Sequence, residues 1–291
     1  MSQIVVKHYS QPDARRHLMV GIVIALGALF FAAEQLGHWF AAHPQAARGL
    51  AASLLAGLAT GLGAFPMLFL RRPAERLMAP LLGLAGGMML AASLFSLLVP
   101  AVQTVAASEA SFVLGALTAF AFLAGVAMMQ HMDRRLPHAH VEAIESAGSR
   151  PHLALVVAAI ALHNLPEGLA VGISAAAGAD HGMTFGIALQ NIPEGWIVAS
   201  ALLALGAAPV RAALIALASG LVEPLGGMLG VVASSLAGPA LPLALAFAAG
   251  AMLWVVSHEL IPASHAPGRE AAGTAGLAAG FAIMTGLAAV F

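Results

Sequence analysis

Long apolar runs separated by short polar connections fill most of the chain. A helix that crosses a bilayer needs about 20 apolar residues, and the sequence offers nine such runs. The nine predicted spans cover residues 18–40, 49–70, 77–101, 111–132, 152–175, 183–205, 212–236, 240–262 and 272–291. The longest polar stretch, 133–151, is too short for a soluble domain. The pattern therefore predicts an all-α, polytopic membrane helix bundle.

Composition narrows what this bundle can do. Of the 291 residues 60% are hydrophobic and 9% are charged, against roughly 25% charged residues in a soluble domain, so most of the apolar surface must face lipid. The formal net charge of −1 is uninformative by itself. The chain is expected to partner the lipid bilayer and no nucleic acid. Since cysteine is absent, any bound metal must be held by His, carboxylate, amide or Met side chains.

Lysine and arginine favour the cytoplasmic side of a membrane protein, which predicts an orientation. With the N-terminus in the cytoplasm, eleven of the twelve basic residues lie inside and only Arg48 lies outside. The C-terminus at Phe291 then lies outside. The first span has a basic flank like that of a signal peptide, but its long apolar run, which contains Glu34 and Gln35, favours a retained anchor helix over a cleaved signal.

A six-residue motif occurs twice on consecutive spans. HNLPEG at 163–168 recurs as QNIPEG at 190–195, 27 residues later. Because consecutive spans run in opposite directions, the two copies are inverted relative to each other. Inverted repeats with broken helices near mid-membrane are a recurrent transporter design.

Each copy of the motif combines polar side chains with a proline. His163 and Glu167 are four residues apart and share one face of a helix, with Asn164 about 100° round from His163. Pro166 has no amide hydrogen, so it kinks the helix and frees the carbonyl of Leu162. Gly168 lets another backbone approach. The second copy repeats the pattern with Gln190, Asn191, Pro193 and Glu194.

Three carboxylates are predicted at membrane depth. Glu223, near the centre of the seventh span and followed by Pro224, joins Glu167 and Glu194. Ionised carboxylates are costly there and repel one another, and divalent cations relieve both problems. Mixed nitrogen and oxygen ligands suit zinc and its neighbours better than calcium or magnesium. If Glu167 and Glu194 each bridge two metals, the site is binuclear.

Other interpretations of these residues remain open at the level of sequence. The glutamates can be protonated and hydrogen-bonded to amides in a helix interface, or can form a proton relay without metal. The chain can then be a proton- or sodium-coupled carrier of an organic substrate. An intramembrane metalloenzyme could use the same ligands on a bound water. Enzyme activity is not expected, because the two-histidine pattern of zinc proteases and a phosphate-binding loop for ATP are both absent from the sequence.

At the two motifs the chain resembles the ZIP (Zrt/Irt-like protein) family of divalent metal transporters, over residues 49–291, and most resembles bacterial members with a binuclear site. The resemblance implies eight core helices in a 3+2+3 inverted-repeat arrangement within 49–291. Residues 1–48 then form a cytoplasmic N-terminus and one extra helix. It also implies a homodimer in the plasma membrane, the inner membrane of a bacterium. The cargo moving into the cytoplasm is Zn²⁺, with Cd²⁺, Fe²⁺ or Mn²⁺ as further candidates, and there is no prosthetic group.

The resemblance also implies the ligands. One metal would be held by His163, Glu167, Gln190 and Glu194, with Met89 of the third span. The other would be held by Asn164, Glu167, Asn191, Glu194 and Glu223. Gln190 stands where many relatives have His, and Asn191 replaces a carboxylate found in some relatives, so this chain departs from the family pattern at two ligands.

A second polar group lies toward the cytoplasmic side. His258 and Glu259 are near the cytoplasmic end of the eighth span, and Asp133, His138 and His140 are expected in the cytoplasmic loop. Together they would form an exit relay that passes metal from the core to the cytosol. The alternative is that the loop histidines are ordinary polar surface.

Overall fold

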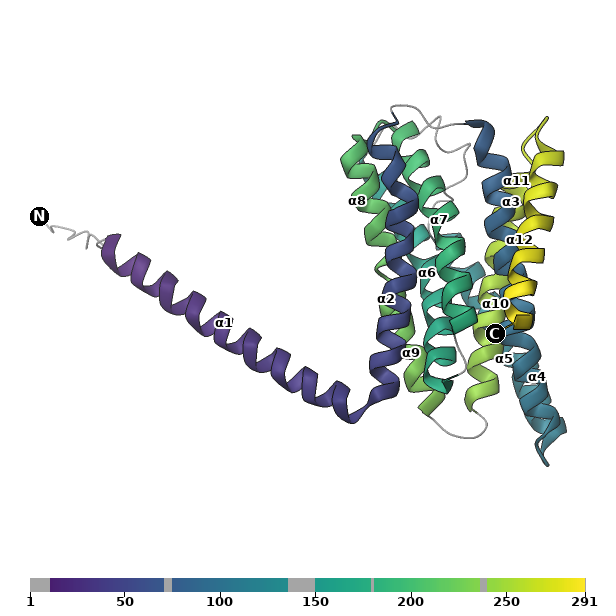
Figure 1. Ribbon diagram of the computed structural model, residues 1–291, viewed down its shortest axis with the longest axis horizontal. Helices are drawn as coiled ribbons and strands as arrows, with labels where there is room; N and C mark the ends of the chain where they lie inside the picture. The colour runs from purple at the N-terminus through teal and green to yellow at the C-terminus, as the bar shows by residue number, and fades with distance from the viewer. Residues whose placement is uncertain (1–10, 71–74, 136–149, 179–180, 236–239, 291) are drawn as a thin grey trace, which may run out of the picture. The chain divides into compact units, whose positions relative to one another are not determined.

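The computed structural model describes residues 11–70, 75–135, 150–178, 181–235 and 240–290. This described part of the chain is built from helices and contains no strand. The prediction of an all-α bundle is therefore confirmed. Most of the helices are long (Figure 1).

The chain divides into two units, Met1–Ala47 and Arg48–Phe291. The first contains α1 (Gln11–Ala42), which covers the predicted span 18–40. Large apolar side chains of α1 are exposed, with Phe30 at 73% and Phe31 at 62% of their full accessible area. Such a surface is typical of a helix that lies in lipid.

Helices of the second unit correspond to the other eight predicted spans. They are α2 (Pro44–Ala64) with the 3₁₀ turn η1 (Phe65–Leu68), α3 (Glu75–Ala91) continued by η2 (Ala92–Leu98) and α4 (Val99–Ala106), α5 (Ser111–Arg135), α6 (Arg150–Ala177), α7 (His181–Ala204), α8 (Pro209–Gly220) with α9 (Glu223–Ser235), α10 (Ala240–Val255) continued by η4 (Val256–Leu260) and α11 (Ile261–Ser264), and α12 (Glu270–Val290).

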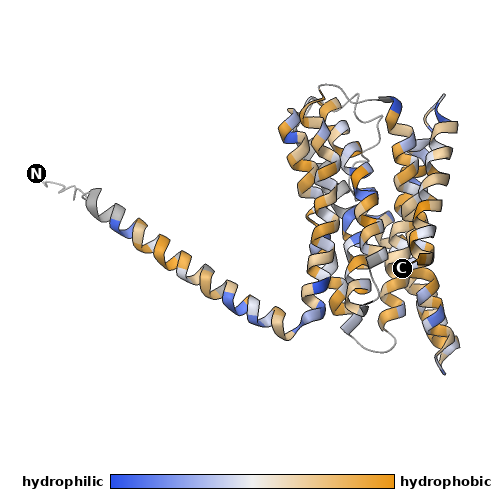
Figure 2. Ribbon diagram, in the orientation of Figure 1, coloured by the Kyte–Doolittle hydropathy of each residue, from blue (hydrophilic) through white to orange (hydrophobic). Residues whose placement is uncertain are grey.

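Eight segments in the described part of the chain are long and apolar enough to cross a membrane. They account for eight of the nine predicted spans. The ninth, 152–175, falls on α6, whose side chains are described only from His163 onward. Apolar residues cover most of the length of the bundle helices (Figure 2), as a lipid-facing surface requires.

The seventh predicted span is broken into two helices. α8 ends at Gly220 and α9 begins at Glu223, with Leu221 and Val222 forming a turn between them. Pro224 has no amide hydrogen to donate to the carbonyl of Gly220, which explains why α8 stops there. Glu223 lies near the centre of the span Pro209–Ser235, as predicted, and within that span it is the first residue of α9, after a break that was not predicted.

Glycines set the closest helix contacts in the bundle. α6 packs against α9, α3 against α12, and α5 against α10. In the first pair, a Cβ added at Gly172 would collide with the backbone of Gly227. In the third pair, Gly125 lies against the carbonyl of Phe247 in the same way. Small residues at these positions let the helix backbones approach, which is how membrane helices gain packing energy.

Candidate metal site

Three helices bring the predicted ligands into one buried region. α6 carries His163, Asn164 and Glu167, α7 carries Gln190, Asn191 and Glu194, and α9 carries Glu223. Asn164, Glu167, Asn191 and Glu223 are fully buried, and Gln190 is 1% exposed. Five buried polar side chains from helices far apart in sequence need a common structural or chemical reason.

The last glycine of each motif makes this convergence possible. Gly168 lies against the backbone of Glu223, and a Cβ there would collide with the Glu223 carbonyl. Gly195 lies against the carbonyl of Thr60 on α2, and a Cβ there would collide with that carbonyl. The prediction that Gly168 admits another backbone is confirmed, and that backbone carries a predicted ligand.

Amides of α7 hold carboxylates from the two neighbouring helices. Gln190 Nε2 donates a hydrogen bond to Glu167 Oε1 at 2.8 Å. Asn191 Nδ2 donates to Glu223 Oε1 at 2.6 Å and to the backbone carbonyl of Ala56 on α2 at 2.8 Å. The two amides therefore place their carbonyl oxygens and the second carboxylate oxygens in the same buried region.

Five carboxylate and amide oxygens in this region are buried and have no hydrogen-bond partner among the described residues. They are Asn164 Oδ1, Glu167 Oε2, Gln190 Oε1, Asn191 Oδ1 and Glu223 Oε2. A buried polar atom without a partner costs about 1–3 kcal/mol, so native proteins contain few of them. Five together, all of them acceptors, are the arrangement that a bound cation satisfies.

The charges of the site favour the same conclusion. Repulsion acts between the carboxylates of Glu167 and Glu223, and Glu194 repels both of them. The three acidic side chains thus lie near enough to interact electrostatically, and their sharing of a cation stays a prediction. A dication held among them would replace repulsion by attraction in a region that excludes water.

His163 has a partner that the sequence analysis did not predict. Its Nε2 atom is 3.1 Å from Glu259 Oε1 on η4, so the imidazole pairs with a residue outside the two motifs. Among the described residues, no group of three or more His, Asp and Glu side chains is placed to hold one metal. Any site here therefore depends on amide oxygens as well as carboxylates, and the two ligand sets stay predictions.

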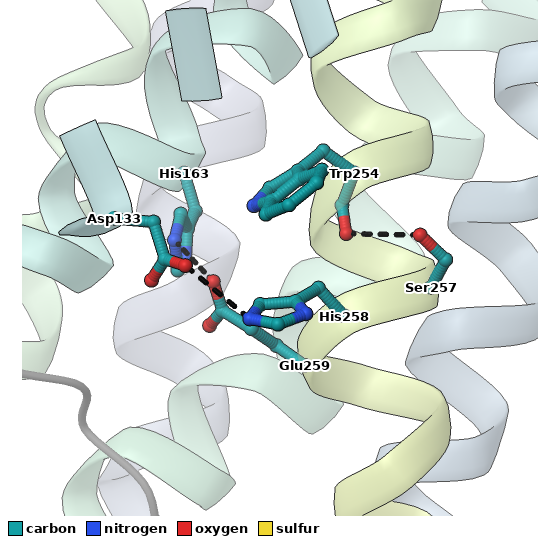
Figure 3. Close-up of polar contacts among 6 residues, drawn as sticks. All are labelled: Asp133, His163, Trp254, Ser257, His258 and Glu259. Carbon is teal, nitrogen blue, oxygen red and sulfur yellow. Dashed lines mark hydrogen bonds and ion pairs between the residues drawn. The ribbon is translucent and has the colours of Figure 1, made fainter. Parts of the chain in front are cut away.

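The predicted exit residues form a chain that begins at His163. Glu259 pairs with His163, and its neighbour His258 lies with Nε2 3.4 Å from Asp133 Oδ2 (Figure 3). The ring of Trp254 lies against that of His258, with centroids 4.7 Å apart. Side-chain exposure is 17% at His163, 23% at Glu259, 43% at His258 and 10% at Asp133, so His258 is the most exposed member of this chain.

Asp133 was expected in a loop but belongs to the helix α5, which extends to Arg135. The apolar run ends at residue 132, whereas the helix continues for almost another turn. This extra length brings Asp133 to His258. His138 and His140 lie outside the described residues. Met89 is 2% exposed on α3 among apolar side chains, and its role as a ligand stays a prediction.

α2 was assigned no part in the site from sequence. In the structure its buried face, which includes Ala56, Gly57 and Thr60, closes the site against α7 and the break between α8 and α9. The only signal of this in the sequence is Ser53 and Thr60, two polar residues that fall on one face of an apolar span.

Comparison with known proteins gives matches of one kind. Residues 130–288 match the family model described as ZIP zinc transporter. The chain is 45% identical to zinc transporter GufA of Myxococcus xanthus, over 81% of this chain and 95% of that protein. It is 40% identical to zinc transporter ZIPB of Bordetella bronchiseptica, over 78% of this chain and 75% of that protein. It is 35% identical to zinc transporter ZupT of Escherichia coli, over 72% of this chain and 84% of that protein.

Proposed function

Because the chain belongs to the ZIP family and therefore transports divalent metal ions rather than acting as an enzyme, we propose that its main cargo is Zn²⁺ and that it carries the ion into the cytoplasm. Relatives named as zinc transporters support zinc as the cargo. The observation that carries the proposal is the group of five buried, unpartnered oxygens beside three mutually repelling carboxylates. Cd²⁺, Fe²⁺ and Mn²⁺ are further candidate cargoes.

The proposed site is binuclear. One metal uses His163, Glu167, Gln190 and Glu194, with Met89, and the other uses Asn164, Glu167, Asn191, Glu194 and Glu223. In this mechanism the arriving ion exchanges its water for carboxylate and amide oxygens. Gln190 and Asn191 each have an amide nitrogen bonded to a carboxylate and an amide oxygen without a partner, so each can hold a carboxylate and a metal at once.

Release is proposed to follow the chain from His163 to Asp133. His163 already contacts Glu259 at 3.1 Å, so a metal held by this imidazole is one side-chain length from the next carboxylate. His258, whose side chain is 43% exposed, and Asp133 follow. Imidazole and carboxylate are both good zinc ligands, so each step replaces ligands of comparable strength.

The proposed assembly is a homodimer in the bacterial inner membrane, with the N-terminus in the cytoplasm and the C-terminus outside. Residues 1–48 supply an extra helix and residues 49–291 the transporter domain in a 3+2+3 inverted repeat. The π-helical segments η2 and η4 support the repeat. Each lies in a corresponding core span and ends two residues before a proline, Pro100 and Pro262 respectively.

The function is tested by zinc flux into proteoliposomes. Glu167→Ala should abolish most of the flux, because it removes a fully buried carboxylate expected to bridge both metals. His163→Ala should reduce flux partly, since other ligands remain. Glu109→Ala, at an exposed acidic residue, is the matched control and should transport like the parent. Equal flux from the parent and both site variants would refute the site assignment.

A further inference from the structure

α2 makes direct contacts with two of the predicted metal ligands, Asn191 and Glu223. Asn191 Nδ2 reaches across to the Ala56 carbonyl at 2.8 Å. A Cβ added at Gly57 would lie 3.6 Å from Glu223 Oε1, so the helix also runs directly beside that carboxylate. Thr60 is one helical turn beyond Ala56 on the same buried face of α2 and is fully buried.

The Thr60 hydroxyl lacks the hydrogen bond that such a group normally makes. Buried hydroxyls in membrane helices usually donate to the carbonyl four residues earlier. Ser53, Ser93 and Thr118 do so, at 2.7, 2.8 and 2.8 Å. Thr60 Oγ1 has no partner, and it is the only hydroxyl among the buried, unpartnered side-chain atoms of the described residues.

Its usual acceptor is already in use. The carbonyl oxygen of Ala56 has two lone pairs. The backbone of α2 takes one in its regular helical hydrogen bond, and Asn191 takes the other. The bond that orients a predicted metal ligand therefore leaves the Thr60 hydroxyl available.

The surroundings of Thr60 are those of the site. Its backbone carbonyl lies against Gly195, the residue after Glu194. Its side chain lies against Gly220, the last residue of α8 before the break that precedes Glu223, where a Cβ would come within 2.6 Å of Thr60 Oγ1. Thr60 thus lies between α7, which carries Glu194, and the end of α8, three residues before Glu223.

We propose that Thr60 Oγ1 is a further metal-binding oxygen of this site, which acts beside Asn191 and Glu223 either on the ion or on a water that the ion retains. A buried hydroxyl without a partner destabilises a fold, so its presence indicates a use outside folding. The inference rests on the proposed function, because it adds a ligand to the same site. A hydroxyl is a hard ligand, so it favours Mn²⁺ over the softer Cd²⁺.

Mn²⁺ and Cd²⁺ binding to the purified full-length protein tests this inference, together with thermal unfolding of the metal-free protein. Thr60→Val removes the hydroxyl at nearly constant volume. It should weaken Mn²⁺ binding by about tenfold, weaken Cd²⁺ binding less, and leave the unfolding temperature equal or higher. Thr60→Ser keeps the hydroxyl and should bind both ions like the parent. Thr118→Val removes a buried hydroxyl that is bonded elsewhere and should leave both affinities unchanged.

Three results would overturn the inference. In the first, Thr60→Val binds both ions like the parent. In the second, it loses affinity for both ions equally and unfolds at a lower temperature, which assigns the hydroxyl a structural role. In the third, Thr60→Val does not fold while Thr60→Ser does, which also assigns the hydroxyl a structural role. A parent protein that binds neither of these ions nor Zn²⁺ would instead refute the proposed function itself.

Discussion

At the scale of single residues, the proposed site depends on amides where relatives can have stronger ligands. Gln190 and Asn191 are uncharged, yet each is bonded to a glutamate and has a free amide oxygen. An amide oxygen binds zinc less tightly than imidazole does. We therefore expect this chain to bind its cargo weakly enough to release it readily.

Gln190→His should increase the affinity for Zn²⁺ and slow transport. The buried imidazole offers a better zinc ligand than the amide it replaces, and about 1.4 kcal/mol of added binding energy corresponds to tenfold in affinity. Zinc titration of the purified variant and flux at saturating zinc measure the two effects. Leu189→Ala, next to Gln190 but outside the motif, is the control. Weaker zinc binding by Gln190→His would contradict this account of the ligand.

At the scale of the helices, the site is held together by backbone contacts rather than by large side chains. Gly168 and Gly195 each lie against the backbone of another helix. The break between α8 and α9 puts Glu223 at a helix N-terminus, where the backbone dipole favours an anion. Irregular backbone at membrane depth is tolerated where it lies inside the protein, and the break lies against α2.

Gly168→Ala should destabilise the fold and lower metal flux together. Its Cβ would collide with the Glu223 carbonyl, and such overpacking costs about 1–3 kcal/mol. Thermal unfolding in detergent and zinc flux measure the two losses. Gly286→Ala, on the helix α12 with open space around a new Cβ, should be neutral or slightly stabilising. Equal behaviour of the two variants would show that the α6–α9 contact is not tight.

At the scale of the whole molecule, the nine predicted spans would place the two ends of the chain on opposite sides of the membrane. The same predicted topology would put eleven of the twelve basic residues in the cytoplasm. His258, the most exposed member of the chain from His163 to Asp133, lies near the ends of α5 and α10, which the predicted topology places on the cytoplasmic side. Inward release along that chain therefore requires this orientation.

Thiol labelling tests the orientation without interference, because the chain has no native cysteine. Ala289→Cys, near the end of α12, should react with an impermeant reagent added to intact cells. Ser2→Cys should react only after the membrane is opened. A cysteine-free parent is the control for background labelling. Labelling of both positions from the same side would exclude nine spans.

Several features could be predicted because they depend on local sequence. The spans from 49–70 to 272–291 follow from apolar runs, and their helices begin and end within a few residues of the predicted limits. The double motif predicted which helices carry the acidic residues. The break after Gly220 was not predicted, although Pro224, which lacks an amide hydrogen, is a signal for it in the sequence. Asp133 was misplaced because a helix can outlast the apolar run that reveals it.

By itself the sequence determined that this protein lies in a membrane, roughly where its helices begin and end, and which side chains could hold a metal. Only the tertiary structure decided which of those side chains meet. His163 pairs with Glu259, Asn191 with Ala56 and Glu223, and Thr60 lies between α7 and α8. These contacts join residues far apart in the chain, and they depend on how closely glycine-lined helices approach, which local periodicity does not encode.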